Sequence, residues 1–152
     1  MVLSDKTKER RNKTMTTYYF DMDGVLANFH KDFDYKKRAQ QALNRKWIAN
    51  LEPFANNIQI VKTLIAQGNR VYILTAAAND QARLGKIDFL AKWLPELNIQ
   101  TSFICIIGHG KKVDYIREEG ILVDDDKKNI TPWRKAGFTA IYLENKGETV
   151  QI

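Results

Sequence analysis

Two aspartates, Asp21 and Asp23, stand two residues apart at the end of an aromatic, apolar run that begins at Tyr18. This run predicts a short buried strand, and Gly24 marks the turn that leaves it. Carboxylates at the end of a buried strand are costly unless their charge is compensated, either by a bound cation or by a shared proton. An Asx turn, which Asp and Gly also favour, is the structural alternative.

Four further residues with polar chemistry follow other apolar runs, at a strand end or in the next loop: Thr75, Lys112, Asp124 and Asp125. In open parallel sheets, ligands bind outside the carboxyl ends of the strands. Neighbouring strands lie about 4.8 Å apart, so three adjacent strand ends fit within about 10 Å. If the strand at 17–21 is central, between the second and fourth strands, all these side chains can converge on one small volume.

Carboxylates gathered in such a volume repel each other, by about 4 kcal/mol for a pair at about 4 Å and an effective dielectric of about 20. A hard divalent cation would relieve this repulsion, and ligands that are all oxygen favour magnesium. A lysine beside magnesium and a threonine hydroxyl forms a phosphate-binding arrangement. One carboxylate could then attack phosphorus, and a second could give and take the proton.

The elements that must position these residues alternate between strand and helix. Five apolar runs predict buried strands at about 17–21, 71–75, 103–107, 121–123 and 139–143. This alternation predicts an α/β domain of three layers, in which helices cover both faces of a central parallel sheet of five strands.

Helices are expected between these strands, and capping residues predict where they begin. We expect one from Asp32 or Asp34 towards Trp47 and Ile48, and one from a cap at Asn56 or Asn57 to Gly68. Three more are predicted from Asp80 to before Pro95, around 113–118, and from Thr131–Pro132. In the helix from Asp80, the residues expected to face inward are Leu84, Ile87, Leu90 and Ala91.

The chain has 152 residues, 44% of them hydrophobic and 28% charged, as expected for one soluble globular domain. No apolar run approaches the length of a membrane span, and the N-terminus lacks the apolar segment of a secretory signal. The single cysteine, Cys105, lies in an apolar run and is expected to act as a small buried hydrophobe. A cytoplasmic location follows as the expectation.

The formal net charge is +6, and part of this excess lies at the N-terminus. Residues 1–16 hold five basic and two acidic side chains, which leaves +3. This segment could be a basic arm for nucleic acid, or a solvated tail that precedes the domain at 17–152. The second interpretation is preferred, so nucleic acid is not the favoured partner.

Four short motifs, in order, resemble those of haloacid dehalogenase-type phosphatases. They are Asp21 to Ala27, Leu74 to Ala76, the lysine at 112, and Ile121 to Asp125. Within this superfamily the chain is most similar to the 5'(3')-deoxyribonucleotidase branch, including its small phage and bacterial members. The residues that carry this finer resemblance are Phe29, the run Val71 to Ala76, Tyr115 and Ile116 after Lys112, and Lys128 and Asn129 after the paired aspartates.

The resemblance implies a magnesium-dependent phosphatase and a role for each matching residue. Asp21 would attack phosphorus, and Asp23 would be the acid/base while its backbone carbonyl binds magnesium. Asp124 and Asp125 would bind or orient magnesium together with Asp21, and which of the two is the inner ligand stays open.

The remaining matching residues would hold the substrate. Thr75 and the Ala76 amide would hold phosphate oxygens, and Lys112, or its neighbour Lys111, would neutralise the developing charge. Phe29 matches a position where the family packs an aromatic ring near the base. Trp47 could be a stacking platform for a base or, as preferred, part of the apolar face that attaches the cap to the body.

One departure from the family concerns the helical cap between the first two motifs. Residues 28–54 leave room for only a small cap insertion, which would seal the site less well against water. Either the site is open to varied or larger phosphoesters, or the second subunit of a homodimer closes it.

Three functional hypotheses follow. The first is a magnesium-dependent phosphomonoesterase of the 5'-nucleotidase type, which dephosphorylates (deoxy)nucleoside monophosphates through an aspartyl-phosphate. The second keeps this chemistry for another small phosphoester or for phosphorylated nucleic-acid ends. The third, a non-catalytic nucleic-acid-binding protein, is disfavoured because a pure binder has no need for this set of acids and lysine.

Overall fold

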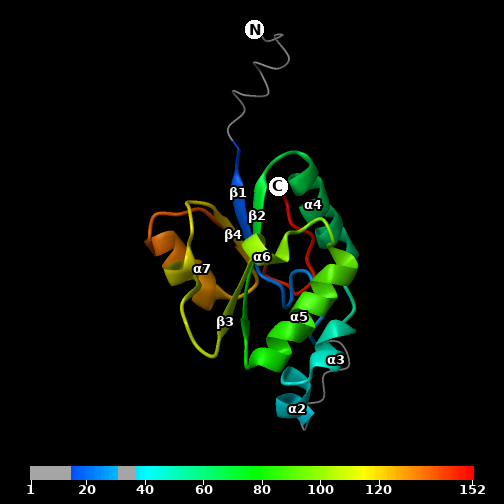
Figure 1. Ribbon diagram of the computed structural model, residues 1–152. Coiled ribbons are helices and arrows are strands. Elements are labelled where there is room, and N and C mark those ends of the chain that lie inside the picture. Colours follow the sequence, from blue (N-terminus) through cyan, green and yellow to red (C-terminus); the bar gives the residue numbers. More distant parts are fainter. Residues whose placement is uncertain (1–14, 31–36) are drawn as a thin grey trace, which may run out of the picture.

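A parallel sheet of five strands forms the centre of the protein. The computed structural model describes residues 15–30 and 37–152 (Figure 1). The strand order is β3-β2-β1-β4-β5, and every neighbouring pair is parallel. The strands are β1 (Thr17–Phe20), β2 (Arg70–Ala77), β3 (Phe103–Ile107), β4 (Ile121–Asp124) and β5 (Ala140–Tyr142). The predicted α/β class is confirmed, and β1 does lie between β2 and β4.

Both faces of this sheet are covered, so side chains that alternate along a strand enter two different cores. Tyr18 and Phe20 lie in the core under α4 (Ala55–Ala66) and α5 (Asp80–Trp93). Tyr19 enters the core on the opposite face, where Trp133 of α7 (Lys127–Lys135) is fully buried. Figure 1 shows α7 on one side of the sheet and α4 and α5 on the other. These are the three predicted layers.

The buried face of α5 differs from the predicted one. Its buried residues are Ala82, Gly85, Lys86, Phe89 and Leu90, whereas Leu84 and Ile87 are only partly buried and Ala91 is exposed. The prediction is confirmed for Leu90 but was wrong for the other three residues, because it followed the apolar side chains, whereas Gly85 and Lys86 occupy the inner face. Position 85 requires glycine because α3 lies so close that a Cβ there would be 2.6 Å from the Arg45 carbonyl oxygen.

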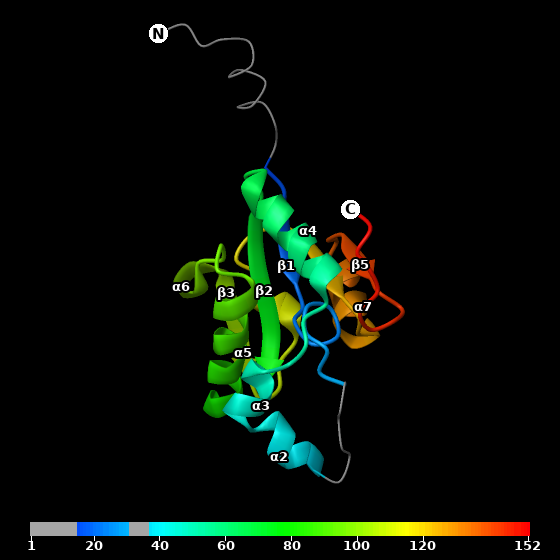
Figure 2. The same cartoon turned by 90° about the vertical axis from the view of Figure 1, so that its right-hand side faces the viewer.

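The described part of the insertion, residues 28–30 and 37–54, holds two short helices, whereas the sequence predicted one helix. They are α2 (Arg38–Ala42) and α3 (Arg45–Ala49), and the predicted start at Asp32 or Asp34 lies outside the described residues. Asn44 separates the two helices, because its side chain accepts a hydrogen bond from the Trp47 amide and caps α3. Figure 2 shows α3 packed beside α5, and an Arg45–Asp88 ion pair of 2.7 Å joins them.

Two predicted helix starts were wrong. Phe54, not Asn56 or Asn57, is the N-cap of α4, because Asn57 turns into the core. Helix α7 begins five residues before Pro132, after Asp126, whose side chain accepts a hydrogen bond from the Lys128 amide. Proline is therefore inside this helix, and it removes one intrahelical donor.

The helix predicted around 113–118 is the 3-10 helix η2 (Lys112–Tyr115), and the short α6 (Ile99–Ser102) was not predicted.

The residues that follow β5 are packed against the core. Leu143 and Val150 are buried. The Gly147 amide donates to the Gly24 carbonyl at 2.8 Å, so this segment also supports the turn after β1 (Figure 2). No helix within residues 15–30 and 37–152 is long and apolar enough to cross a membrane.

Candidate active site

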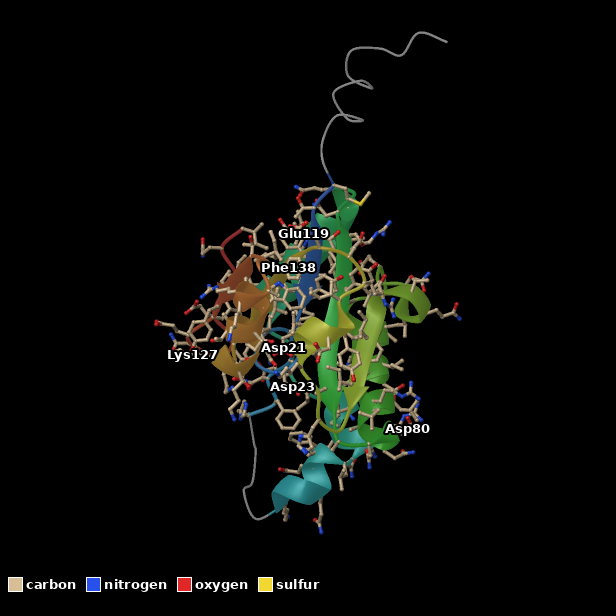
Figure 3. The ribbon with its side chains drawn as sticks, turned by 90° about the vertical axis from the view of Figure 1, so that its left-hand side faces the viewer. Asp21, Asp23, Asp80, Glu119, Lys127 and Phe138 are labelled. Atoms are coloured by element: carbon tan, nitrogen blue, oxygen red, sulfur yellow. The ribbon has the colours of Figure 1, made fainter. Side chains whose placement is uncertain are left out.

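The turn after β1 fixes the direction of the first two aspartates. The Met22 carbonyl accepts hydrogen bonds from the amides of Val25, Leu26 and Ala27, at 2.8 to 3.2 Å. Gly24 has a φ of 82°, which suits glycine because it lacks a Cβ. Asp21 and Asp23 consequently stand close together at the carboxyl end of β1, as Figure 3 shows.

Lys112 joins Asp21 to Asp124 across two adjacent strands. Its Nζ donates to Asp21 Oδ1 at 2.7 Å and to Asp124 Oδ2 at 2.8 Å, and the lysine is only 5% exposed. Lys111, the alternative in the sequence, is exposed. The geometry therefore brings Lys112, and not its neighbour, to the aspartates.

Burial shifts the pKa values of Asp21 and Asp124, and the charges of these two acids shift that of Lys112. Desolvation raises the pKa of Asp21 to about 6, although Lys112 opposes this shift. Desolvation likewise raises the pKa of Asp124 to about 6, with a further contribution from the charge of Asp21. Burial alone would lower the pKa of Lys112, but the two carboxylates raise it above its usual range. The single ammonium of Lys112 does not fully compensate the charges of the buried acids, because their pKa values stay raised. A bound cation would supply the missing positive charge.

Three carboxylates are close enough to hold one metal ion. Asp21, Asp124 and Asp125 each offer an oxygen, and these oxygens lie within 4.8 Å of one another. The donors are all hard oxygens, and two of the residues are buried, so this set fits magnesium. This set consists of side-chain oxygens; the predicted contact of Asp23 with magnesium is through its backbone carbonyl and remains a prediction.

Asp124 and Asp125 are held in different ways. Asp124 is fully buried and accepts from the Asp126 amide at 2.9 Å and from Asn129 Nδ2 at 3.1 Å, in addition to Lys112. Asp125 accepts from Lys146 Nζ at 2.8 Å, and the Lys146 side chain is half exposed. Asp124 is therefore bound firmly within the protein, whereas Asp125 faces the cavity described next.

An open cavity of about 610 Å³ lies over this cluster. Asp21, Asp23, Thr75, Ala76 and Lys112 line it, so the predicted phosphate-binding residues do face the same space as the predicted catalytic ones. Thr75 and Ala76 lie inside β2, which continues to Ala77 and is longer than predicted. The outer wall includes Phe29, His30, Lys127, Tyr142 and Lys146.

The two aromatic residues predicted to contact substrate lie in different places. Phe29 lines the site cavity, whereas Trp47 lines a separate cavity of about 570 Å³ on the insertion. Their rings pack edge to face, with centroids 5.2 Å apart. Trp47 also packs against the main core, which agrees with the preferred interpretation that it attaches the cap to the body.

Sequence reasoning missed a buried lysine in this site. Lys86 of α5 donates to Asp23 Oδ2 at 2.9 Å and to Thr75 Oγ1 and the Ala76 carbonyl, both at 2.7 Å. A signal for it existed, because Lys86 lies four residues from Ala82 and Leu90, on the buried face of the helix. Asn129, which the resemblance included without a role, donates to Asp124, and Lys146, for which the sequence gave no signal, donates to Asp125.

Comparison with known proteins gives structural neighbours only. No family model matches the chain, and no curated protein matches its sequence. One structural neighbour is a HAD family enzyme from Bacteroides thetaiotaomicron, solved as a magnesium complex. The identity is 13%, the TM-score is 0.54, and the match covers 90% of this chain and 96% of that one.

A second neighbour is a chain in the structure of the Pnkp1/Rnl/Hen1 complex, with 16% identity and a TM-score of 0.58. The match covers 87% of this chain but 47% of that one, so the chain spans about half the length of this neighbour. At these identities the likeness concerns the fold. The protein has a HAD-like, Rossmann-type α/β fold, and its acidic cluster lies at the carboxyl ends of β1 and β4.

Proposed function

We propose that this protein is a magnesium-dependent phosphomonoesterase that works through an aspartyl-phosphate on Asp21. The observation that carries the proposal is the position of Lys112, which contacts both Asp21 and Asp124 inside a group of three carboxylates that fits a divalent cation. The fold, shared with a HAD family enzyme solved with magnesium, is consistent with it.

The proposed reaction has two steps. A carboxylate oxygen of Asp21 attacks phosphorus, the bond from phosphorus to the leaving oxygen breaks, and a proton from Asp23 passes to that oxygen. Water then attacks phosphorus, Asp23 takes a proton from it, and the bond from Asp21 to phosphorus breaks to release phosphate. Thr75 and the Ala76 amide would hold phosphoryl oxygens, while Lys112 stabilises the added negative charge.

Asp21, Asp124 and Asp125 are proposed to hold the magnesium ion, together with the Asp23 carbonyl. When bound, the ion would neutralise charge on the phosphoryl oxygens. Of the paired aspartates, Asp125 is the better candidate for the direct ligand. Three hydrogen bonds already occupy the oxygens of Asp124, whereas Asp125 lines the cavity.

The proposed substrate class is a nucleoside monophosphate, with a deoxyribonucleotide as the first candidate. Aromatic rings of Phe29 and Tyr142 in the cavity wall offer surfaces for a base, and Lys127 and Lys146 add positive charge around an anionic substrate. This assignment rests on the sequence resemblance to the 5'(3')-deoxyribonucleotidase branch. The structural neighbours support the fold and not this branch.

A second candidate substrate is the phosphorylated end of a nucleic acid. The cavity is open, and Lys127, Lys146 and Tyr142 stand on its wall, so a longer anionic chain could leave the site past them. The likeness to a chain of the Pnkp1/Rnl/Hen1 complex is compatible with this alternative. The predicted basic arm at 1–16 lies almost wholly outside the described residues and adds no structural support.

The test is phosphate release from a panel of ribo- and deoxyribonucleoside monophosphates and phosphorylated oligonucleotides, with magnesium or with excess chelator. We expect turnover that requires magnesium and that falls by at least about 10³-fold in Asp21→Asn. Glu119→Gln is the matched control, because Glu119 is exposed at the opposite end of β4, as Figure 3 shows. Activity that survives excess chelator would refute the proposal, whichever substrate is preferred.

A further inference from the structure

Lys86 is a buried cation that none of the proposed steps uses. It is 2% exposed and lies on the inner face of α5. Its ammonium contacts Asp23, which follows β1, and Thr75 and Ala76 of β2. A lysine is expensive to bury unless its charge and its three N–H donors are all matched. Its position therefore needs a physical reason.

All three donors of Lys86 have an acceptor in the site. Thr75 Oγ1 and the Ala76 carbonyl oxygen each lie 2.7 Å from Nζ, and Asp23 Oδ2 lies 2.9 Å away. Since an ammonium has only three protons, none is left for a substrate. Lys86 is thus not placed to bind phosphate itself, in contrast to Lys112.

The contact with Thr75 determines the direction of the hydroxyl proton. Because the Thr75 oxygen accepts from Lys86, its own hydrogen must point elsewhere, and Thr75 lines the site cavity. The Thr75 hydroxyl is thus oriented to donate its hydrogen towards the cavity, where a phosphoryl oxygen of the substrate could accept it.

The contact with Asp23 is that side chain's one hydrogen bond within the described part of the chain. The second carboxylate oxygen, Oδ1, is buried and has no partner there. Lys86 is therefore the group that holds the Asp23 carboxylate in place, although the two residues are 63 positions apart in the sequence.

We propose that Lys86 is a positioning residue that fixes the proton donor Asp23 and the phosphate-binding hydroxyl of Thr75 in one arrangement. The inference rests on the proposed phosphatase function. In the first step a proton leaves Asp23 for the leaving oxygen as the bond from phosphorus to that oxygen breaks, and the ammonium of Lys86 stabilises the carboxylate that remains.

The leaving group separates this role from a merely structural one. An alkoxide needs a proton as it departs, whereas dinitrophenolate does not. In Lys86→Met, which keeps the length of the side chain but removes its charge and donors, kcat/KM for a nucleoside monophosphate should fall about 10²-fold more than kcat/KM for dinitrophenyl phosphate. The loss of the Thr75 orientation should lower both values equally.

Lys92→Met is the matched control, because Lys92 is on the same helix and exposed; the ratio of the two kcat/KM values should stay that of the wild type. Lys86→Gln, which keeps a donor on a shorter side chain, is a second variant in case Lys86→Met does not fold, and its ratio should change in the same direction by less. Equal losses on both substrates would overturn the proposed positioning of Asp23, leaving an effect through Thr75 alone, and would leave the phosphatase proposal intact. Absence of magnesium-dependent turnover by the wild type would overturn both.

Discussion

Gly24 lies directly against the carboxylate of Asp125, so that the turn after β1 and the end of β4 meet without space for a side chain. A Cβ at Gly24 would collide with Asp125 Oδ2 and lie 2.9 Å from its carboxyl carbon. The glycine of the first motif therefore has a steric role in the proposed metal site as well as a conformational role in the turn.

Gly24→Ala should weaken magnesium binding by at least about 10-fold, because Asp125 must move away from the other two carboxylates. The positive φ adds strain of about 1–2 kcal/mol. Gly68→Ala separates the two effects: Gly68 has a φ of 88° with nothing within 4 Å of the added Cβ. Magnesium titrations by calorimetry should show the loss in Gly24→Ala alone, and equal affinities in the two variants would contradict the steric role.

Lys112→Met should reduce both activity and stability, because Asp21 and Asp124 would lose their shared partner. Removal of one member of a buried ion pair costs about 3–5 kcal/mol, and removal of one charge-stabilising donor costs about 10²–10³-fold in kcat. Urea unfolding in chelator and phosphate release with magnesium measure the two effects. Lys111→Met, at the exposed neighbour, should change neither. A Lys112→Met enzyme with full activity would remove this lysine from the mechanism.

The metal-free protein should lose stability as the pH rises from about 4 to about 6. The folded-state pKa values of Asp21 and Asp124 are about 6, above the ordinary value of 3.8. The stabilisation is therefore complete below the unfolded pKa and lost as the pH passes the folded one, at about 1.4 kcal/mol per pH unit for each group. Magnesium should consequently stabilise the protein more at about pH 7.5 than at about pH 4.5.

Thermal unfolding in chelator and in magnesium at both pH values measures this dependence. Asp124→Asn isolates the contribution of Asp124, because it removes one of the two titrating groups. The stability of this variant in chelator should therefore depend less on pH. A metal-free protein whose pH dependence is the same in Asp124→Asn would show that this carboxyl does not titrate in the stated range.

Asn57→Ala should destabilise the protein by about 2–3 kcal/mol, because it leaves buried polar groups without partners. The Asn57 amide donates to the carbonyls of Val25 and Glu148, and its oxygen accepts from the Val150 amide at 2.9 Å. Chemical unfolding gives the difference, with Asn56→Ala as the control at an exposed neighbour. If the two variants are equally stable, Asn57 does not join the C-terminal segment to the turn after β1.

The sheet was predictable because each strand contains a short apolar run, and β1, β3 and β4 end at or directly before a polar residue or a glycine. In a parallel sheet this pattern gives the strand and also the edge where ligands bind. Helix boundaries were less predictable, because side chains such as Asn57 take roles that depend on distant neighbours. Asn57 is a good N-cap by type, but its partners are Val25, Glu148 and Val150, which only the fold brings near.

The acids of the site were predictable for a related reason. Asp21, Asp23, Asp124 and Asp125 follow directly from strands, so the sheet alone determines where they meet. Lys86 comes from the inner face of a helix, where a lysine resembles a surface residue unless its four-residue spacing from Ala82 and Leu90 is recognised. Lys146 and Asn129 likewise reach the paired aspartates from elements whose side-chain directions the sequence leaves undetermined.

The central claim, that Asp21 receives the phosphoryl group, can be tested by acid-quenching the enzyme during turnover of a phosphate-labelled nucleotide and mapping the label by peptide mass spectrometry. We predict label on the peptide that holds Asp21, dependent on magnesium, and none in Asp21→Asn. Label on another residue, or undiminished turnover by Asp21→Asn, would contradict the account.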